Sequence, residues 1–334
     1  MDALLASTNA DIADFLAPTH VREYGDPPSA LVFLKECVAP HQPCVVKNGF
    51  LTSDSWHACV AKWDLSYFET DPALAEKIVK VNATPDGLAD AVKSSGNDRV
   101  FTTPCEVQMK MGDFVRSLGR GKAEGDAVLY LSEQNDNLRS HFADSLMRDI
   151  PQDIPLAREV FGAESGGGDG ETFASGSLTA VNLWIGDERS VSSLHKDFYE
   201  NFYFVVKGCK VFDLLPPAAV LNMRYQRFPC KQYTLGSSSS SGGGEVPRAR
   251  DLTLIDCGDD VEWLDEGGGD PASPALRVHL REGQMLYVPA LWLHRVTQVE
   301  PTIAVNYWFE QAFDHRYVLY NLCRRLGELR AVEE

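Results

Sequence analysis

The chain has 334 residues, of which 44% are hydrophobic and 24% are charged. This composition is that of a globular protein with a substantial core, which excludes disordered, coiled-coil and collagen-like folds for most of the chain. With 31 basic and 48 acidic residues, the net charge is −17. That charge repels phosphate backbones and disfavours nucleic-acid binding, whereas it favours a cationic partner or simply serves solubility.

The N-terminus and the cysteines indicate the compartment. Residues 1–14 carry no basic cluster ahead of an apolar run, so they lack the pattern of a secretory signal peptide. No window reaches the ~18 uninterrupted apolar residues of a membrane span, so no membrane partner is expected. The cysteines are scattered without a Cys-x-x-Cys pair, which argues against a disulfide framework or a zinc ribbon. We therefore predict reduced, mostly buried thiols in a cytoplasmic protein, with the nucleus as the alternative location.

The first 126 residues mix helix and strand signals. Residues 43–47 predict a short buried strand before a turn at Asn48-Gly49. Helices are predicted at 72–79, where Asp71 is the N-cap and Pro72 the first helical residue, and at 87–92 and 113–118. A strand is predicted at 127–131.

From about residue 177 the pattern becomes that of a β protein. Short β-branched and aromatic runs follow one another without intervening helices, which predicts a sandwich or barrel. Turns are expected at Glu282-Gly283 and, as a hairpin, at Lys207-Gly208. The expected strands are 178–185, 201–206, 209–215, 277–280, 284–288 and 303–309.

Glycine- and serine-rich stretches and the C-terminal tail complete the organisation. Residues 165–170, 236–244 and 267–269 are predicted to be surface loops because such sequences cannot pack a core. Residues 312–330 are predicted to be helical, with one apolar stripe. The stripe consists of Leu319, Leu322, Leu326 and Leu329. It could pack on the barrel of its own chain or on a second subunit, and the sequence favours neither.

Two histidines and an aspartate form the candidate metal site. Among the histidines, only His195 begins a His-x-Asp/Glu triplet, which ends at Asp197. Residues i and i+2 of a strand share a face, so both side chains project together, although a lone strand histidine is more often a core residue. His294 follows a turn, a buried strand and a proline break, where another barrel strand should begin. Two imidazoles and one carboxylate occupy one face of an octahedron and leave three positions open, which suits Fe(II).

Lys210 is the candidate anion-binding residue. On its predicted strand it shares a face with the apolar residues Phe212 and Leu214, so its side chain should point inward. Burying an unpaired amine costs free energy, so an anion is expected to bind it. The alternative is a lysine at the strand start that extends to solvent. If a dicarboxylic cosubstrate chelates the metal at one end, Lys210 is placed to pair with the far carboxylate.

Three further polar residues are candidates for hydrogen bonds to such a cosubstrate. Tyr130, Asn201 and Ser192 have suitable side chains, although each also fits an ordinary strand or turn role. Ser192 has the wrong strand parity relative to His195, so its participation requires a β-bulge.

Long segments of the sequence resemble the jumonji-C (JmjC) domain family. The resemblance is carried by 181–217 and 281–309, and it extends to PCVVKNG (43–49), KWDLSYF (62–68), TPDGLADAV (84–92) and AVLYL (127–131). Together these segments are similar to the jumonji domain-containing protein 7 subfamily over nearly the whole chain. The loops at 165–170 and 236–244 depart from the family pattern.

The resemblance implies a mainly β fold with a cupin-like double-stranded β-helix core. The core would span 127–310, after an N-terminal α/β extension at 1–126 and before a C-terminal helical, homodimer-forming region at 311–334. The family's iron ligands fall on His195, Asp197 and His294. Its contacts to 2-oxoglutarate fall on Lys210, Tyr130, Ser192 and Asn201. Ser192 replaces a threonine that is common in the family. Asn306 matches a position near the cosubstrate.

The implied activity is that of an Fe(II)- and 2-oxoglutarate-dependent oxygenase that consumes O₂ and releases succinate and CO₂. The subfamily hydroxylates a lysine at C3 in developmentally regulated GTP-binding proteins, so such a protein is the expected partner. The alternatives are an N-methyl-lysine demethylase, a peptidase acting on histone tails, and a non-catalytic cupin-like scaffold. A lysyl substrate suits the acidic surface, and Asp136, Asp187 or Glu188 near the predicted barrel mouth are candidates to hold its ammonium.

Overall fold

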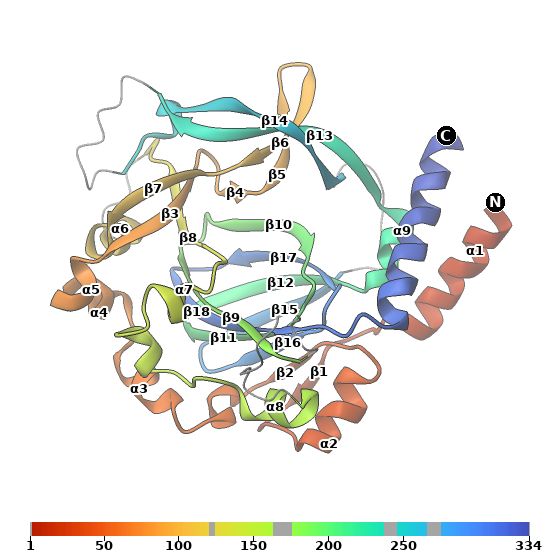
Figure 1. The fold of residues 1–334 in the computed structure, drawn as a ribbon, viewed down its shortest axis with the longest axis horizontal. Coiled ribbons are helices and arrows are strands. Elements are labelled where there is room, and N and C mark those ends of the chain that lie inside the picture. Colours follow the sequence, from red (N-terminus) through yellow and green to blue (C-terminus); the bar gives the residue numbers. More distant parts are fainter. Residues whose placement is uncertain (1, 120–123, 163–175, 237–245, 266–274, 334) are drawn as a thin grey trace, which may run out of the picture.

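The computed structural model describes residues 2–119, 124–162, 176–236, 246–265 and 275–333. Three sheets organise this part of the chain (Figure 1). The nine-stranded sheet has the order β1-β2-β16-β11-β18-β9-β8-β3-β7, the five-stranded sheet β15-β12-β17-β10-β4, and the four-stranded sheet β14-β13-β6-β5.

The core is built from strands that alternate between two facing sheets. One sheet holds β9 (Leu178–Gly186), β11 (Tyr199–Lys207), β16 (Met285–Val288) and β18 (Thr302–Glu310), and the other holds β10 (Val191–Lys196), β12 (Cys209–Leu215), β15 (Leu276–Arg281) and β17 (Leu293–Gln298). Neighbours within each group pair antiparallel. This alternation is the double-stranded β-helix, so the predicted fold class and all six predicted strands of this region are confirmed.

The turn at Gly208 corrects one detail of the prediction. Gly208 adopts φ 85°, which favours glycine. The strands it connects do not form a hairpin, because β11 pairs within the nine-stranded sheet and β12 within the five-stranded sheet. The turn at Glu282-Gly283 likewise joins β15 to β16 in the other sheet. The sequence predicted both turns correctly. Which strands then pair with each other is decided by the arrangement of the whole barrel.

Apolar side chains from both sheets fill the barrel. The alternation along each strand directs every second residue inward. This cluster includes Tyr203 and Val205 of β11, Phe212 and Leu214 of β12, and Trp292 beside β17. A larger cluster lies on the other face of the nine-stranded sheet, where the N-terminal helices cover it.

The N-terminal region extends the nine-stranded sheet at both edges. β1 (Arg22–Tyr24) and β2 (Cys44–Val46) continue from β16, whereas β8 (Val128–Leu131), β3 (Ile78–Thr84) and β7 (Cys105–Lys110) continue from β9. The predicted domain boundaries after residues 126 and 310 stay predictions. The α-helices before the barrel are α1 (Asp2–Asp11), α2 (Ala30–Phe33), α3 (Trp56–Lys62), α4 (Leu65–Thr70), α5 (Pro72–Ala75), α6 (Met111–Leu118), α7 (Asn137–Ser140) and α8 (Pro155–Phe161).

Two helix predictions need correction. The helix predicted at 72–79 begins as expected, with the Asp71 carboxylate accepting from the N–H groups of Ala73 and Leu74, but it ends at Ala75. The helix predicted at 87–92 is wrong, because β4 (Leu88–Ala89) and β5 (Ala91–Ser95) occupy that stretch. Positive φ angles at Gly87 and Asp90 break the helical path and turn the chain onto β10. The helix at 113–118 and the strands at 43–47 and 127–131 are confirmed within a few residues.

The four-stranded sheet was not expected from the sequence. It consists of β5, β6 (Asp98–Thr103) and the long pair β13 (Arg224–Leu235) and β14 (Leu252–Asp265). These strands are half exposed and polar, so they lack the apolar runs of the barrel. The predicted loops at 165–170 and 267–269, and all of 236–244 except Gly236, lie outside the described residues. The cysteines are free thiols, and all but Cys257 are buried, as predicted.

The C-terminal helix α9 (His315–Glu333) lies against the short helix η5 (Pro217–Asn222) and beside the N-terminal segment, as Figure 1 shows. Its packed face carries Tyr320 and Cys323, and of the predicted leucine stripe only Leu326 is among the residues packed there. Leu319, Leu322 and Leu329 are 40%, 53% and 54% exposed. Packing of the whole stripe on the barrel is therefore excluded, and the homodimer stays a prediction. Among the helices of the described residues, none has the length and apolar character to cross a bilayer.

Candidate metal centre

His195, Asp197 and His294 come together at one end of the barrel. Their ligand atoms all lie within 4.8 Å of one another, and His294 Nε2 is 3.6 Å from Asp197 Oδ2. The two imidazole rings have their centroids 4.3 Å apart. Side chains far apart in sequence thus share the space of one metal ion, as the sequence predicted.

Backbone carbonyl groups orient both imidazoles. His195 Nδ1 lies 2.6 Å from the carbonyl oxygen of Ser193, and His294 Nδ1 lies 2.9 Å from that of Trp292. A carbonyl oxygen only accepts, so each Nδ1 carries a proton and each Nε2 is the nitrogen left for a metal. Metal-binding histidines are commonly fixed in this way. The donor set, two imidazole nitrogens and one carboxylate, therefore fits a divalent metal of the Fe(II) type.

Strand register places the two histidines opposite each other. β10 pairs antiparallel with β17, and His195 is the partner of His294. Asp197 follows the end of β10, where its carbonyl accepts from the N–H of Leu291 at 2.8 Å. Leu291 has φ 68°, an unfavourable conformation for a leucine, and the adjacent Ala290 N–H donates to the buried Glu200 carboxylate. This strained turn ties the two ligand-bearing segments together.

The protonation of the triad suits metal binding. Burial, together with the neighbouring His294, lowers the pKa of His195 to about 4, so its imidazole is neutral. Burial acts against ionisation of Asp197, but the hydrogen bond from His294 and the charges of His195, His294 and Lys196 together outweigh it and lower the pKa of Asp197. Burial likewise acts against protonation of His294, and the Asp197 carboxylate outweighs it and raises the pKa of His294. A metal ion would replace the proton that His294 and Asp197 share.

Lys210 points into the barrel, so the solvent-exposed alternative is wrong. Its side chain is 0% exposed, and Nζ donates a hydrogen bond of 2.9 Å to the Tyr130 hydroxyl. The rings of Tyr130 and Tyr203 lie 5.1 and 5.7 Å from Nζ. Among the described residues, no carboxylate forms an ion pair with it, and burial lowers the pKa of Lys210 to about 7. A buried amine with no anion is costly, which points to an anionic ligand.

The predicted polar contacts gather around the same cavity. Tyr130, Ser192, Asn201 and Asn306 line it together with the three metal ligands. Ser192 forms a hydrogen bond with Tyr130, and the required bulge in β10 lies between Ser192 and His195. The amide of Asn306 donates to Asn201 Oδ1 at 3.1 Å. The predicted side chains therefore line one cavity, and their contacts to a cosubstrate stay predictions.

A comparison with protein families supports this geometry. The cupin-like domain model matches residues 29–315, which include the barrel and all three metal ligands. The chain belongs to the cupin-like JmjC family. The membership identifies the barrel as that of a 2-oxoglutarate oxygenase, because JmjC oxygenases use Fe(II) and 2-oxoglutarate.

Three JmjC relatives match almost end to end. The chain is 32% identical to human "Bifunctional peptidase and (3S)-lysyl hydroxylase JMJD7" over 99% of both chains. It is 29% identical to Arabidopsis thaliana "Lysine-specific demethylase JMJ32" over 95% of this chain and 89% of that protein. It is 28% identical to Dictyostelium discoideum "JmjC domain-containing protein E" over 97% and 93% of the two chains.

Sequence reasoning missed part of this JmjC cavity. Gln134, Trp184, Tyr203 and Trp308 also line it. Asn306 Oδ1 accepts from Trp184 Nε1 at 2.8 Å, so one amide links the neighbouring strands β9, β18 and β11. A signal was present, since the paired strands β9 and β18 both carry the pattern Val-Asn-x-Trp, at 181–184 and 305–308. On a strand, the asparagine and tryptophan of this pattern share a face.

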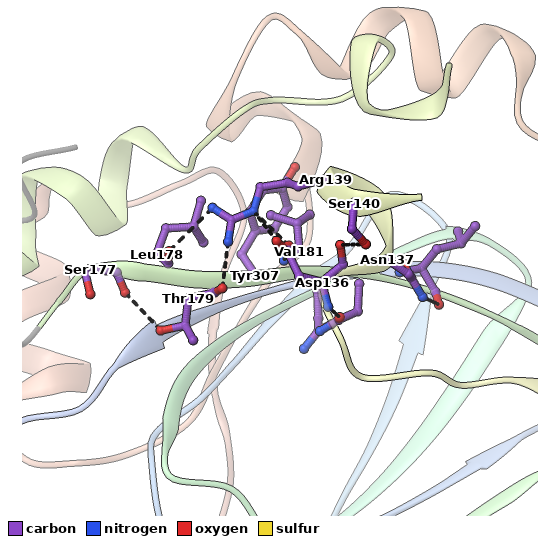
Figure 2. A network of polar contacts seen from close by, with 12 residues as sticks. Asp136, Asn137, Arg139, Ser140, Ser177, Leu178, Thr179, Val181 and Tyr307 are labelled. Atoms are coloured by element: carbon purple, nitrogen blue, oxygen red, sulfur yellow. Dashed lines mark hydrogen bonds and ion pairs between the residues drawn. The ribbon is translucent and has the colours of Figure 1, made fainter. Parts of the chain in front are cut away.

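The acidic residues predicted to bind a substrate ammonium lie elsewhere in this JmjC fold. Asp136 accepts from Arg139 Nε at 2.8 Å and from the Val181 N–H, and Figure 2 shows this network at the start of β9. Asp187 is fully buried and pairs with Arg189 at 2.7 Å. Asp136, Asp187 and the exposed Glu188 are absent from the residues that line the cavities around the metal ligands. The carboxylates of Asp136 and Asp187 therefore hold local structure.

The buried amine predicts a pH-dependent stability. The pKa of Lys210 is about 7 in the fold, whereas a free lysine has a pKa of about 10.4. Between these values the unfolded chain binds the extra proton, so the free energy of unfolding should rise with pH from 7 to 10, by up to about 1.4 kcal/mol per pH unit. The measurement is denaturant unfolding of the wild type and Lys210→Met without 2-oxoglutarate. Parallel pH profiles for the two proteins would contradict the assignment.

Proposed function

We propose that the protein is an Fe(II)- and 2-oxoglutarate-dependent lysyl hydroxylase that oxidises a lysine of another protein, with C3 as the target carbon. Developmentally regulated GTP-binding proteins are the first candidate substrates. The observation that carries the proposal is a triad of two histidines and one carboxylate that lines the same cavity as Tyr130. Tyr130 accepts a hydrogen bond from Lys210, a buried lysine that has no anionic partner among the described residues. When bound, the metal would supply activation of O₂ at the expense of 2-oxoglutarate.

The chain's own residues bind and orient the reactants. His195, His294 and Asp197 would hold the metal and leave coordination positions for exogenous ligands. Lys210 pairs with the distal carboxylate of 2-oxoglutarate, and Tyr130 fixes the amine in place. The carboxylate offsets the free-energy cost of burying the Lys210 amine, and this gain favours binding of the cosubstrate.

The asparagines and aromatic rings keep the cavity ordered. Asn306 donates to Asn201 and accepts from Asn182 and Trp184, so its amide has a fixed orientation. Water is excluded by the surrounding rings, which include Tyr203 and Trp308. The role of these residues is to aim a substrate C–H bond at the metal face rather than to perform acid–base chemistry.

The test uses Fe(II), 2-oxoglutarate and a recombinant developmentally regulated GTP-binding protein. We expect succinate formation coupled to the gain of one oxygen atom on a lysine, located by mass spectrometry and, at C3, by nuclear magnetic resonance. Loss of a methyl group from a methylated histone peptide would instead support the demethylase alternative. Peptide cleavage without 2-oxoglutarate would support the peptidase, and no succinate with any basic protein would support the scaffold.

A further inference from the structure

A second cavity adjoins the metal centre and shares two of its ligands. Its volume is about 180 Å³, and it is lined by His195 and Asp197 together with Asp90, Ser193 and Trp263, among others. The first cavity is lined by Tyr130, Asn201 and Asn306, the predicted cosubstrate contacts, and the second cavity offers separate space beside the metal ligands for a substrate side chain.

Asp90 is placed in this cavity by the strand that carries the metal ligands. It follows β4, which pairs in parallel with β10 so that Ala89 is the partner of Ser192. The hydroxyl of the buried Ser193 donates to the carbonyl oxygens of Ala89 and Asp90. Asp90 itself adopts φ 52°, a conformation that aspartate and asparagine tolerate better than most residues. The β10 strand therefore fixes both His195 and Asp90.

The Asp90 carboxylate has no cationic partner of its own. Among the residues that the structure describes, none donates a hydrogen bond to this carboxylate or forms an ion pair with it, and burial raises the pKa of Asp90. This contrasts with Asp86 on the same loop, which pairs with Lys93 at 2.7 Å. A half-buried carboxylate without a partner loses part of its hydration, and an incoming cation offsets that loss.

The chain's own lysine in this cavity is engaged elsewhere. Lys196 Nζ lies over the rings of Phe198, Tyr320 and Tyr225, at 4.5, 5.3 and 5.9 Å. Such an aromatic cage satisfies an ammonium group through cation–π contacts. Lys196 therefore leaves Asp90 available to a cation from outside the chain.

A second group in the cavity also lacks a partner. Trp263 Nε1 is buried, and no acceptor for it lies among the described residues. An indole N–H is a donor only, so it remains unpaired in this wall. The carboxylate of Asp90 in the same cavity matches an ammonium-bearing side chain.

We propose that Asp90 binds the ammonium group of the substrate lysine in this cavity, an inference that rests on the proposed lysyl hydroxylase function. Asp90 is then a specificity-determining residue of the site. It takes the role that the sequence had suggested for Asp136, Asp187 or Glu188.

The test compares Asp90→Asn with the wild type and with Asp86→Asn. Asparagine keeps the size and the positive φ of Asp90, and Asp86→Asn removes one charge from the same loop outside the cavity. The probes are a degenerate peptide library with a central lysine and a matched library with norleucine at that position. Binding is measured by equilibrium dialysis with the full chain loaded with Mn(II) and N-oxalylglycine, and thermal melting checks that each variant is folded.

We expect wild type and Asp86→Asn to prefer lysine over norleucine by about 10- to 100-fold, and Asp90→Asn to lose that preference. A preference retained in Asp90→Asn, or absent from the wild type, overturns the inference. Turnover of the same libraries with Fe(II) and 2-oxoglutarate separates the two proposals. If lysine preference depends on Asp90 but no peptide gains oxygen, the inference stands and the hydroxylase function fails. If Asp90→Asn hydroxylates lysine peptides like the wild type, the inference fails and the function stands.

Discussion

Asp197→Ala is expected to lower succinate formation by about 10³-fold or more, because it removes the one anionic ligand of the metal. The two imidazoles that remain are neutral when bound, so they hold a divalent cation weakly. His294 also loses the carboxylate that raises its pKa. The measurement is 2-oxoglutarate turnover at saturating Fe(II), together with calorimetric titration of Mn(II).

Asp213→Ala is the matched control for this change. Asp213 lies on β12, next to the ligand-bearing strand β17, and it pairs with Arg277 near the surface. Its loss should leave turnover and Mn(II) affinity near those of the wild type, because surface ion pairs contribute little. Succinate formation by Asp197→Ala at a tenth of the wild-type rate or more would show that the metal lies elsewhere.

Lys210→Met is expected to raise the KM for 2-oxoglutarate by about 30-fold or more, since loss of one partner of a buried charge pair costs several kcal/mol. Methionine retains the length and volume of the lysine stem, so the change concerns the charge. Without 2-oxoglutarate the variant should melt at a higher temperature than the wild type, because it no longer buries an unpaired amine. Cosubstrate titrations of succinate formation and thermal melting test the two effects separately.

Lys207→Met provides the corresponding control. Lys207 ends β11, three positions before Lys210, but its amine is exposed and pairs with Glu282 at 3.1 Å. We expect a KM and a melting temperature close to those of the wild type. An unchanged KM in Lys210→Met would mean that the anion-binding cation of the site is another residue.

Local patterns were sufficient to predict the strands of the barrel and the three side chains that meet at the candidate metal centre. Strand periodicity identifies which side chains share a face, as it did for Lys210 with Phe212 and Leu214, all of which are buried. The same reasoning required a bulge before His195, and β10 contains it. These features depend on neighbours in sequence, so they could be predicted from the sequence.

The helix predicted at 87–92 failed for a reason that is not local. Gly87 has φ 86°, and a Cβ there would lie 1.8 Å from the carbonyl oxygen of Arg189. The Val191 N–H also donates to the Gly87 carbonyl. The segment is extended because β10 lies beside it, and this tertiary pairing overrides the start signal for a helix.

Strand periodicity and the cost of burying charge predicted a sandwich or barrel, the candidate metal triad and the inward-facing Lys210, whereas the double-stranded β-helix was implied by the resemblance to the JmjC family. The tertiary structure alone decided which carboxylates are already neutralised. Asp136 and Asp187 pair with arginines two or three positions away. Asp90 lies in the segment wrongly predicted to be a helix, and it is without an ion-pair partner among the described residues in the cavity beside the metal centre. Ion pairing depends on where side chains meet in space, so no sequence pattern could distinguish these three aspartates.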